Sequence, residues 1–297
     1  MNLRPQKFDD IIGQDDVVER LRISVFGCKN PVASMPHVLI DGPPGLGKTT
    51  IASAIASELG VNMYTVNAAN VRNIKGILPY LMTMTLNSVL FIDEIHRLPK
   101  IVEEFLYPVM EDFKMGLVIE GDPESIDIPH FTMVGATTSG GSLSQPFYDR
   151  FTIKEHLSFY TSNVLAKLAR SNCDSMNIDI SDEDLLNIAH RSKGTPRILN
   201  ARLQWYKSYT SFYPEEKSLE KIFGMQGIDK NGFDENDKKY LDILQKNRGN
   251  PLGLKAMSSL TGIAMETIEN SIEPYMIRKG YVRRTQRGRV LGKGNGV

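Results

Sequence analysis

A glycine-rich run is the first place where residue types and spacing suggest chemistry. Residues 42–49 read GPPGLGKT, between a short apolar segment and a helical pattern. Glycines let backbone N–H groups close around phosphate oxygens, and the N-terminus of the following helix adds its positive end. We expect Lys48 to reach the β- and γ-phosphates of a nucleoside triphosphate and Thr49 to ligate Mg²⁺. A simple glycine-rich turn would not require this Lys-Thr pair.

Two adjacent carboxylates follow a second apolar segment. Residues 89–92 read VLFI, the pattern of a buried strand, and Asp93 and Glu94 come directly after it. Ligands of open α/β sheets bind at the carboxyl ends of the strands. Asp93 would therefore hold Mg²⁺ through water, and Glu94 would polarise the attacking water as general base. The alternative, a solvated strand end, explains the pair less well beside a phosphate loop.

Three further positions could respond to a γ-phosphate. Thr138 ends the strand pattern of residues 131–136, which places its hydroxyl at the same sheet edge. Arg150 follows that strand, and Arg197 lies in the sequence GTPR. An arginine presented to a γ-phosphate can accelerate hydrolysis about 10³- to 10⁵-fold. Taken alone, either arginine is better explained as a surface salt-bridge partner, and a threonine at a strand end is common.

The elements that must position these residues change along the chain. Up to about residue 153, continuous apolar strands alternate with helical patterns, which indicates a parallel sheet covered on both faces. Helical patterns follow, and a Gly/Asp-rich linker at 224–232 precedes three more helices and a ribbon at 281–291. We predict an α/β P-loop domain (1–153), a helical lid (154–229) and a winged helix-turn-helix (230–297).

Composition and charge limit the classes of function. Of the 297 residues, 41% are hydrophobic and 24% are charged, which is ordinary for a globular protein, and the net charge is zero. From residue 230 onward, thirteen Lys/Arg outnumber seven Asp/Glu, a local net of +6 that predicts contact with an anionic partner. Two distant cysteines predict neither a disulfide framework nor a zinc site. With no signal peptide or membrane-length apolar run, we expect a cytoplasmic location and no membrane contact.

Taken together, the motifs resemble those of the RuvB family, AAA+ motors that drive Holliday-junction branch migration. The resemblance covers nearly the whole chain. The phosphate loop alone predicts only an NTPase, whereas the longer motifs are far more specific. They read, in order, LRP (3–5), IGQ (12–14), HVLID (37–41), DEIHRL (93–98), MEDF (110–113), GATT (135–138), DRF (149–151), RSKGTPRI (191–198) and RTQRGR (284–289).

The resemblance assigns roles to individual residues. It implies that Thr138 is the first sensor, that Arg197 is the second, and that Arg150 is an arginine finger reaching a neighbouring subunit's site. A finger that acts in trans requires an oligomer, and the family forms a hexameric ring. The nucleotide-binding residues that it implies are Leu3, Arg4, Gly45, Gly47, Lys48, Thr49, Thr50, Glu111, Asp112, Phe113, Arg150, Tyr160 and Arg197.

Two partners are also implied by the resemblance. Arg284 and Arg289 fall on DNA-contacting positions of the wing, and Arg287 lies between them. Guanidinium groups on a protruding ribbon can contact phosphates without reading sequence. A RuvA-type junction-binding protein would meet the hairpin that precedes the sensor strand. Here residues 120–129 are a few residues shorter than in the family and lack its Ala-Arg-Ser, which leaves that partner an open expectation.

We therefore predict an ATP-hydrolysing, ring-forming enzyme that translocates duplex DNA and drives branch migration of four-way junctions in recombination and repair. One alternative is a clamp-loader-like AAA+ ATPase, against which the arginine-rich wing argues. Another is an ATP-controlled DNA-binding switch with little turnover, against which Glu94 and Arg150 argue. A protein remodeller is weaker, since it leaves the basic wing unused.

Overall fold

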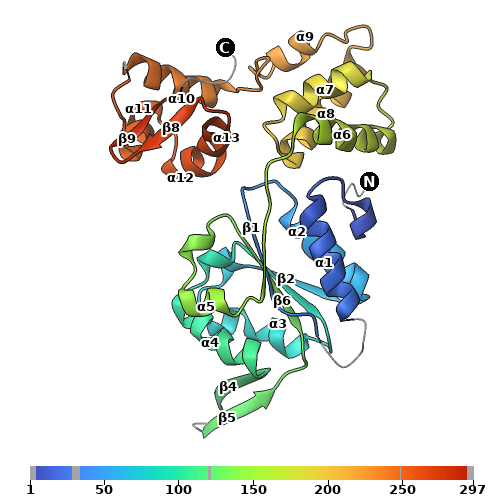
Figure 1. Ribbon diagram of the computed structural model, residues 1–297, viewed down its shortest axis with the longest axis vertical. Helices are drawn as coiled ribbons and strands as arrows, with labels where there is room; N and C mark the ends of the chain where they lie inside the picture. Colours follow the sequence, from blue (N-terminus) through green and yellow to red (C-terminus); the bar gives the residue numbers. More distant parts are fainter. Residues whose placement is uncertain (1–4, 29–33, 120–121, 248, 293–297) are drawn as a thin grey trace. The chain divides into compact units, whose positions relative to one another are not determined.

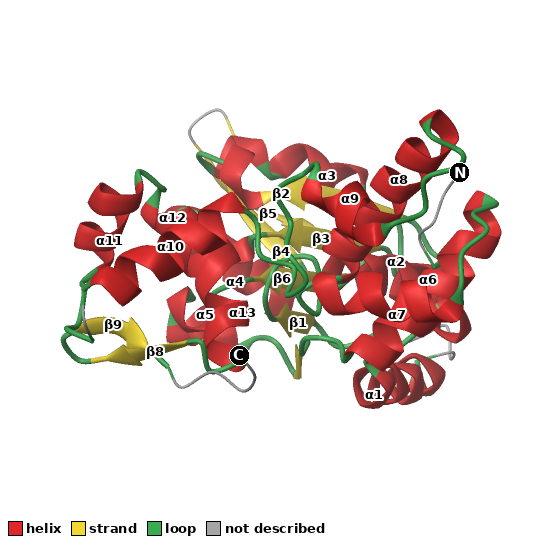
Figure 2. Ribbon diagram, turned by 90° about the horizontal axis from the view of Figure 1, so that it is seen from above, coloured by secondary structure: helices red, strands yellow, loops and turns green. Residues whose placement is uncertain are grey.

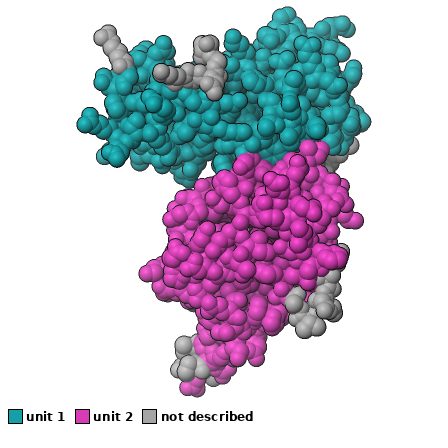
Figure 3. All heavy atoms as spheres, viewed as in Figure 1, with its two compact units in different colours: residues 1, 43–45, 159–297 teal, residues 2–42, 46–158 magenta. Residues whose placement is uncertain are grey.

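The computed structural model describes residues 5–28, 34–119, 122–247 and 249–292. The chain forms two compact units, one made of residues 2–42 and 46–158 and the other of residues 1, 43–45 and 159–297 (Figure 3). The predicted lid and winged-helix segments both fall in the second unit, and the three-domain division of the sequence stays a prediction. No helix within the described ranges is long and apolar enough to cross a membrane.

A five-stranded parallel sheet forms the centre of the first unit, with the strand order β2-β3-β6-β1-β7 (Figure 1). Residues 89–92 of β3 are all fully buried, which confirms the buried-strand prediction. Residues of β6 are likewise buried on both faces, as expected when helices cover both sides of a parallel sheet. The strands are β1 Val38–Asp41, β2 Met63–Asn67, β3 Val89–Asp93, β6 Thr132–Thr137 and β7 Ile153–His156.

Helices cover the two faces of this sheet through alternate strand residues. On one face, α2 packs against β3 and β6, and α1 packs on α2. On the other, Leu90 and Ile92 of β3 share an apolar cluster with Val102 and Leu106 of α4. The α-helices of the unit are α1 Asp15–Gly27, α2 Lys48–Leu59, α3 Leu78–Thr83, α4 Lys100–Glu111 and α5 Gln145–Asp149. Short 3-10 turns lie at Phe8–Asp10, Ala68–Asn70, Ile74–Gly76, Ile95–Arg97 and Gly140–Ser142.

A two-stranded antiparallel hairpin extends from the first unit (Figure 1). It consists of β4 Lys114–Ile119 and β5 Asp122–Asp127, paired from Lys114 with Asp127 to Ile119 with Asp122. Met115 and Ile128 at its base are buried in the same cluster as α4. The hairpin is therefore anchored by its base.

The second unit is mostly helical, with one small ribbon (Figure 2). Its first four helices surround one apolar core, and a second core lies under the remaining elements. The last of the three helices predicted after the linker contains a π-helical turn, and the predicted ribbon is confirmed. The elements are α6 Ser162–Met176, α7 Asp182–Arg191, α8 Pro196–Phe212, α9 Leu219–Gly224, α10 Glu235–Lys246, α11 Leu254–Thr261, α12 Met265–Thr267, the π turn Ile268–Ile272, α13 Glu273–Arg278, β8 Val282–Thr285 and β9 Gly288–Leu291.

Candidate functional site

The glycine-rich loop after β1 adopts the backbone that its glycines permit. Gly42 has φ +144°, and a Cβ there would lie only 2.6 Å from the carbonyl oxygen of Leu157. Gly47, with φ +104°, precedes the first turn of α2, where Thr49 and Thr50 are half-buried. The Lys48 amine donates to the Gly42 carbonyl at 2.6 Å. A helix N-terminus beside a buried lysine suits a phosphate group.

The carboxylates at the end of β3 are held in a defined geometry. Asp93 ends the strand, and Glu94 adopts the left-handed region with φ 50°, an uncommon conformation for a residue with a side chain. The Glu94 N–H donates to Asp93 Oδ1 at 3.0 Å. Thr138, just past the neighbouring strand β6, donates its hydroxyl to Glu94 Oε2 at 3.1 Å. Glu94 and Thr138, predicted separately from the sequence, thus meet at one sheet edge.

A histidine that sequence reasoning left without a role belongs to the same edge. His96 Nδ1 lies 3.0 Å from the Thr137 hydroxyl and 3.4 Å from Glu94 Oε2. Thr137 Oγ1, which is fully buried, accepts the Ser139 N–H at 2.9 Å, so its hydrogen can be donated to His96. His96 therefore helps to fix the groups around Glu94. The only sequence signal was its position two residues after the acidic pair.

The predicted finger is held at a different surface of the first unit. Arg150 pairs with Glu111 Oε1 at 3.2 Å, donates to the Pro146 carbonyl at 2.6 Å and lies 4.0 Å from the centre of the Tyr107 ring. A cavity of about 380 Å³ lies there, and Glu111, Phe113 and Arg150 all line it. The neighbouring Asp112 is exposed at the end of α4.

Three predicted nucleotide-binding residues fall in the second unit. The Tyr160 N–H donates to the Gly194 carbonyl at 2.9 Å. The Arg197 N–H donates to the carbonyl of Gly45 at 3.3 Å, and the Arg197 side chain is exposed. The residues Leu3 and Arg4, also predicted here, lie outside the described residues.

The wing arginines surround a buried carboxylate. Glu273, which is 0% exposed, accepts hydrogen bonds of 2.8 Å from Arg284 Nε, Arg289 Nε and the Tyr240 hydroxyl. Burial by itself would raise the pKa of Glu273, but hydrogen bonds from Arg289, Tyr240 and Arg284 hold it below its ordinary value. Glu269 joins the cluster at 3.1 Å from Arg289 Nη2.

The wing arginines differ in their access to solvent. The Arg284 side chain is 49% exposed and Arg289 only 12%, whereas Arg287 is exposed at the ribbon turn. Sequence reasoning placed all three on DNA but missed Glu273 and Tyr240, which no spacing rule connects to the ribbon. Arg284 and Arg287 offer the accessible charge.

Comparisons with known protein families cover nearly the whole chain. Residues 3–157 match the family described as "Holliday junction DNA helicase RuvB P-loop domain". Residues 160–224 match the "RuvB AAA lid domain" and residues 230–295 the "RuvB C-terminal winged helix domain". The three matches follow one another in the order of the predicted domains.

Individual relatives are similar over most of their lengths. A Rhodopirellula baltica protein named "Holliday junction branch migration complex subunit RuvB" is 40% identical over 299 residues, which cover 98% of this chain and 82% of that protein. A Campylobacter hominis protein with the same name is 40% identical over 298 residues, 98% of this chain and 88% of that one. The solved structure "Thermotoga maritima RuvB Holliday junction branch migration motor" aligns with a TM-score of 0.90 at 37% identity, over 98% of this chain and 96% of that chain.

Proposed function

The chain belongs to the RuvB family, and we propose that it is the ATP-driven subunit of a ring that moves double-stranded DNA through four-way junctions. Its P-loop domain binds nucleotide. The observation that carries the proposal is the Thr138–Glu94 hydrogen bond, which joins the predicted phosphate sensor to the predicted general base. In this proposal the chain works in the cytoplasm, and residues 1–153, 154–229 and 230–297 act as ATPase domain, lid and DNA-binding domain.

The residues around the phosphate loop fit ATP and Mg²⁺. Gly47 directly precedes the N-terminus of α2, where an added Cβ would meet only Thr50 at 4.0 Å, and Lys48 supplies a positive charge there. The Thr49 hydroxyl and a water held by Asp93 would complete the Mg²⁺ shell. Bound Mg²⁺ supplies charge neutralisation for the transferred phosphoryl group.

In the proposed hydrolysis, Glu94 acts as general base and Thr138 responds to the γ-phosphate. The Glu94 carboxylate accepts the proton of the attacking water, and the Thr138 hydroxyl orients it by donating to Oε2. Thr138 can exchange its hydrogen bond to Glu94 for one to a γ-phosphate oxygen. This exchange would report the presence of phosphate to the general base.

An oligomer follows from the position of the finger. Arg150 lies at the cavity with Glu111 and Phe113, and its ion pair with Glu111 involves a carboxylate that is 57% exposed. Water around the Glu111 carboxylate weakens its attraction for the guanidinium. The Arg150 side chain is itself 19% exposed, so to reach a neighbouring subunit's phosphate it leaves the Tyr107 ring as well as Glu111. We infer that neighbouring subunits complete each other's sites in a ring, with six subunits as in the family.

Two surfaces serve the remaining partners in this proposal. The ribbon β8–β9 contacts the phosphates of duplex DNA through Arg284 and Arg287, while Arg289 supports the ribbon from within. The β4–β5 hairpin contacts a RuvA-type protein that holds the junction, as the relatives' names as subunits of a branch migration complex suggest.

The direct test is ATP turnover with and without a synthetic four-way junction, measured together with the strand products. Junction-stimulated turnover with separated arms supports the motor. Turnover stimulated by a sliding clamp instead supports the clamp-loader alternative, and tight ATP binding without turnover supports the switch. In addition, Glu94→Gln should bind ATP and trap it, and normal turnover in this variant would remove the general-base assignment.

A further inference from the structure

We propose that Lys193, with Asp234 and Asp237, forms a clasp that fixes the winged helix to the lid, so that a lid movement is transmitted directly to the DNA-binding ribbon. This inference rests on the proposed function, because it explains how the motor's stroke would reach DNA. The clasp is defined here as Lys193, Asp234 and Asp237.

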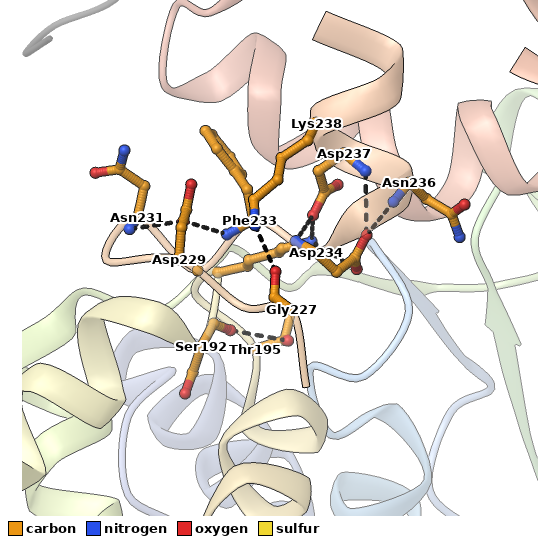
Figure 4. Close-up of polar contacts among 12 residues, drawn as sticks. Ser192, Thr195, Gly227, Asp229, Asn231, Phe233, Asp234, Asn236, Asp237 and Lys238 are labelled. Atoms are coloured by element: carbon orange, nitrogen blue, oxygen red, sulfur yellow. Dashed lines mark hydrogen bonds and ion pairs between the residues drawn. The ribbon is translucent and has the colours of Figure 1, made fainter. Parts of the chain in front are cut away.

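The clasp joins two elements that are far apart in sequence. Lys193 follows α7, and its side chain is only 8% exposed. Its amine bonds to Asp237, whose side chain is 2% exposed, and lies 3.5 Å from Asp234 Oδ2. Both carboxylates belong to the start of α10, where Figure 4 shows them lying close together. The Lys193–Asp237 ion pair is therefore buried, and two charges interact more strongly in the interior of a protein than at its surface.

The two carboxylates are themselves locked to the backbone of α10. Asp234 Oδ1 accepts the N–H groups of Asn236 and Asp237, at 2.9 and 3.1 Å. Asp237 Oδ2 in turn accepts the Asp234 N–H at 2.9 Å, which completes a reciprocal helix cap (Figure 4). Lys193 is therefore bonded to two carboxylates that the backbone of α10 holds in place.

The linker before α10 also contacts the lid, close to the clasp. Gly232 has φ +82°, and a Cβ there would lie 2.2 Å from the Arg191 carbonyl oxygen, so the backbones touch. The Gly232 carbonyl accepts a hydrogen bond of 3.1 Å from Arg202 Nη2 in α8. Asp229 Oδ1 accepts the N–H groups of Asn231 and Phe233, which closes the loop on itself (Figure 4). A linker held in this way leaves little freedom between the two domains.

A second contact lies close to the proposed second sensor. The Arg278 guanidinium of α13 lies 5.2 Å from the centre of the Phe159 ring, within reach of a cation–π interaction. Arg278 Nη1 would also lie 3.2 Å from a Cβ at Gly194, the residue after Lys193. Arg197 follows only three residues later. The segment that responds to nucleotide in this proposal is thus held to the winged helix at two points, which makes Lys193 a positioning residue.

The test measures the distance between lid and winged helix in the full chain by pulsed electron spin resonance. Spin labels at exposed Ser208 in α8 and exposed Lys255 in α11 are placed in a Cys28→Ser background, with Cys173 left buried. We expect one narrow distance distribution, unchanged by nucleotide. Lys193→Met should broaden it, and Lys193→Arg should restore it.

The matched control is Lys246→Met, which removes an exposed ion pair to Asp242 on α10 and should leave the distribution narrow. A narrow distribution in folded Lys193→Met protein would overturn the clasp. If Lys193→Met does not fold, Asp234→Asn removes the half-exposed carboxylate of the clasp and is judged by the same criterion.

Coupling is measured separately as base pairs moved per ATP hydrolysed. In Lys193→Met this ratio should fall about fivefold or more, while ATP turnover without DNA persists. An unchanged ratio with a broadened distribution would overturn the transmission role. If the wild-type chain moves no junction, the proposed function fails, but the distance measurement still decides whether the clasp exists.

Discussion

The arginine of the proposed finger and the arginine of the wing differ in the exposure of the carboxylate that each one pairs with. Arg150 is paired with Glu111, a carboxylate that is 57% exposed, whereas Arg289 is paired with Glu273, which is fully buried and also bonds Arg284 and Tyr240. Arg150 is itself only 19% exposed, but water around the Glu111 carboxylate weakens the attraction between the two charges. Removing a partner from a buried cluster leaves an uncompensated charge, which costs several kcal/mol. A motif arginine can therefore be available for a phosphate or committed to the fold.

The largest effect should come from Arg150→Ala, which tests the available arginine. We expect ATP turnover to fall about 10³-fold or more, because transition-state charge loses its partner. The free energy of unfolding should fall by about 0.5–3 kcal/mol, because the side chain, 19% exposed, loses its packing on Tyr107 as well as its ion pair. Steady-state turnover and urea unfolding measure the two quantities. Mixing with Glu94→Gln subunits should restore some turnover, and absence of rescue would argue against a finger in trans.

Glu273→Gln tests the committed arginine, Arg289, together with its half-exposed neighbour Arg284. The amide keeps the size of the side chain but leaves two guanidinium groups without their buried counter-charge, and we expect a local destabilisation of about 3–5 kcal/mol. Hydrogen exchange of the α13 and β8 amides measures this opening free energy. The control is Glu269→Gln, whose side chain is 41% exposed and whose loss should cost about 1 kcal/mol or less. Equal protection of these amides in Glu273→Gln and Glu269→Gln would contradict the difference that we draw between a buried and an exposed carboxylate.

The salt dependence of DNA binding separates the wing arginines from each other. Arg284→Ala and Arg287→Ala should each lower the slope of log affinity against log salt by about 1, because exposed guanidinium groups release counterions from phosphates. Arg289→Ala should weaken the ribbon while leaving the slope almost unchanged. A slope that drops in Arg289→Ala but not in Arg284→Ala would reverse the assignment.

The smallest effect concerns a buried group that carries no charge. His37 Nδ1 accepts the Met133 N–H at 2.9 Å, and Nε2 donates to the Met110 carbonyl at 3.0 Å, so both contacts suit the neutral ring. Burial lowers the pKa of His37 below its ordinary value. The unfolded chain therefore binds the proton first as pH falls, so the stabilisation is present above pH of about 6.5 and is lost below it, by at most about 1.4 kcal/mol per pH unit.

Hydrogen exchange of the β6 amides between pH 7 and 5 measures this loss, after correction for the intrinsic exchange rate. The control variant is His190→Gln, at an exposed position, which should retain the loss of stability at acid pH. The variant His37→Gln should abolish that loss. An acid response that persists in His37→Gln would assign it to other groups.

The sequence predicts well what short-range patterns determine. The glycines of residues 42–47 need positive φ angles, four apolar residues in a row bury β3, and Asp234 caps α10 three residues before Asp237. Each of these features depends on neighbours within a few positions.

Contacts between distant residues were not predictable in the same way. Lys193 and Asp237 are 44 positions apart, and Tyr240 and Glu273 are 33 apart, so no periodicity brings them together. Reading RTQRGR as a DNA motif likewise gave no sign that Arg289 is mostly buried. Such pairings arise only when packing excludes water from both partners.

The π turn Ile268–Ile272 has a consequence for how much length variation the winged helix can accept. A π turn is equivalent to a single inserted residue, and each residue of a helix turns the chain by about 100°. Deleting one residue there would straighten the helix and swing its earlier part, Met265–Thr267, around the axis while Glu273 stayed in place. In this part of the chain, a change of one residue in length would be more disruptive than most changes of residue type.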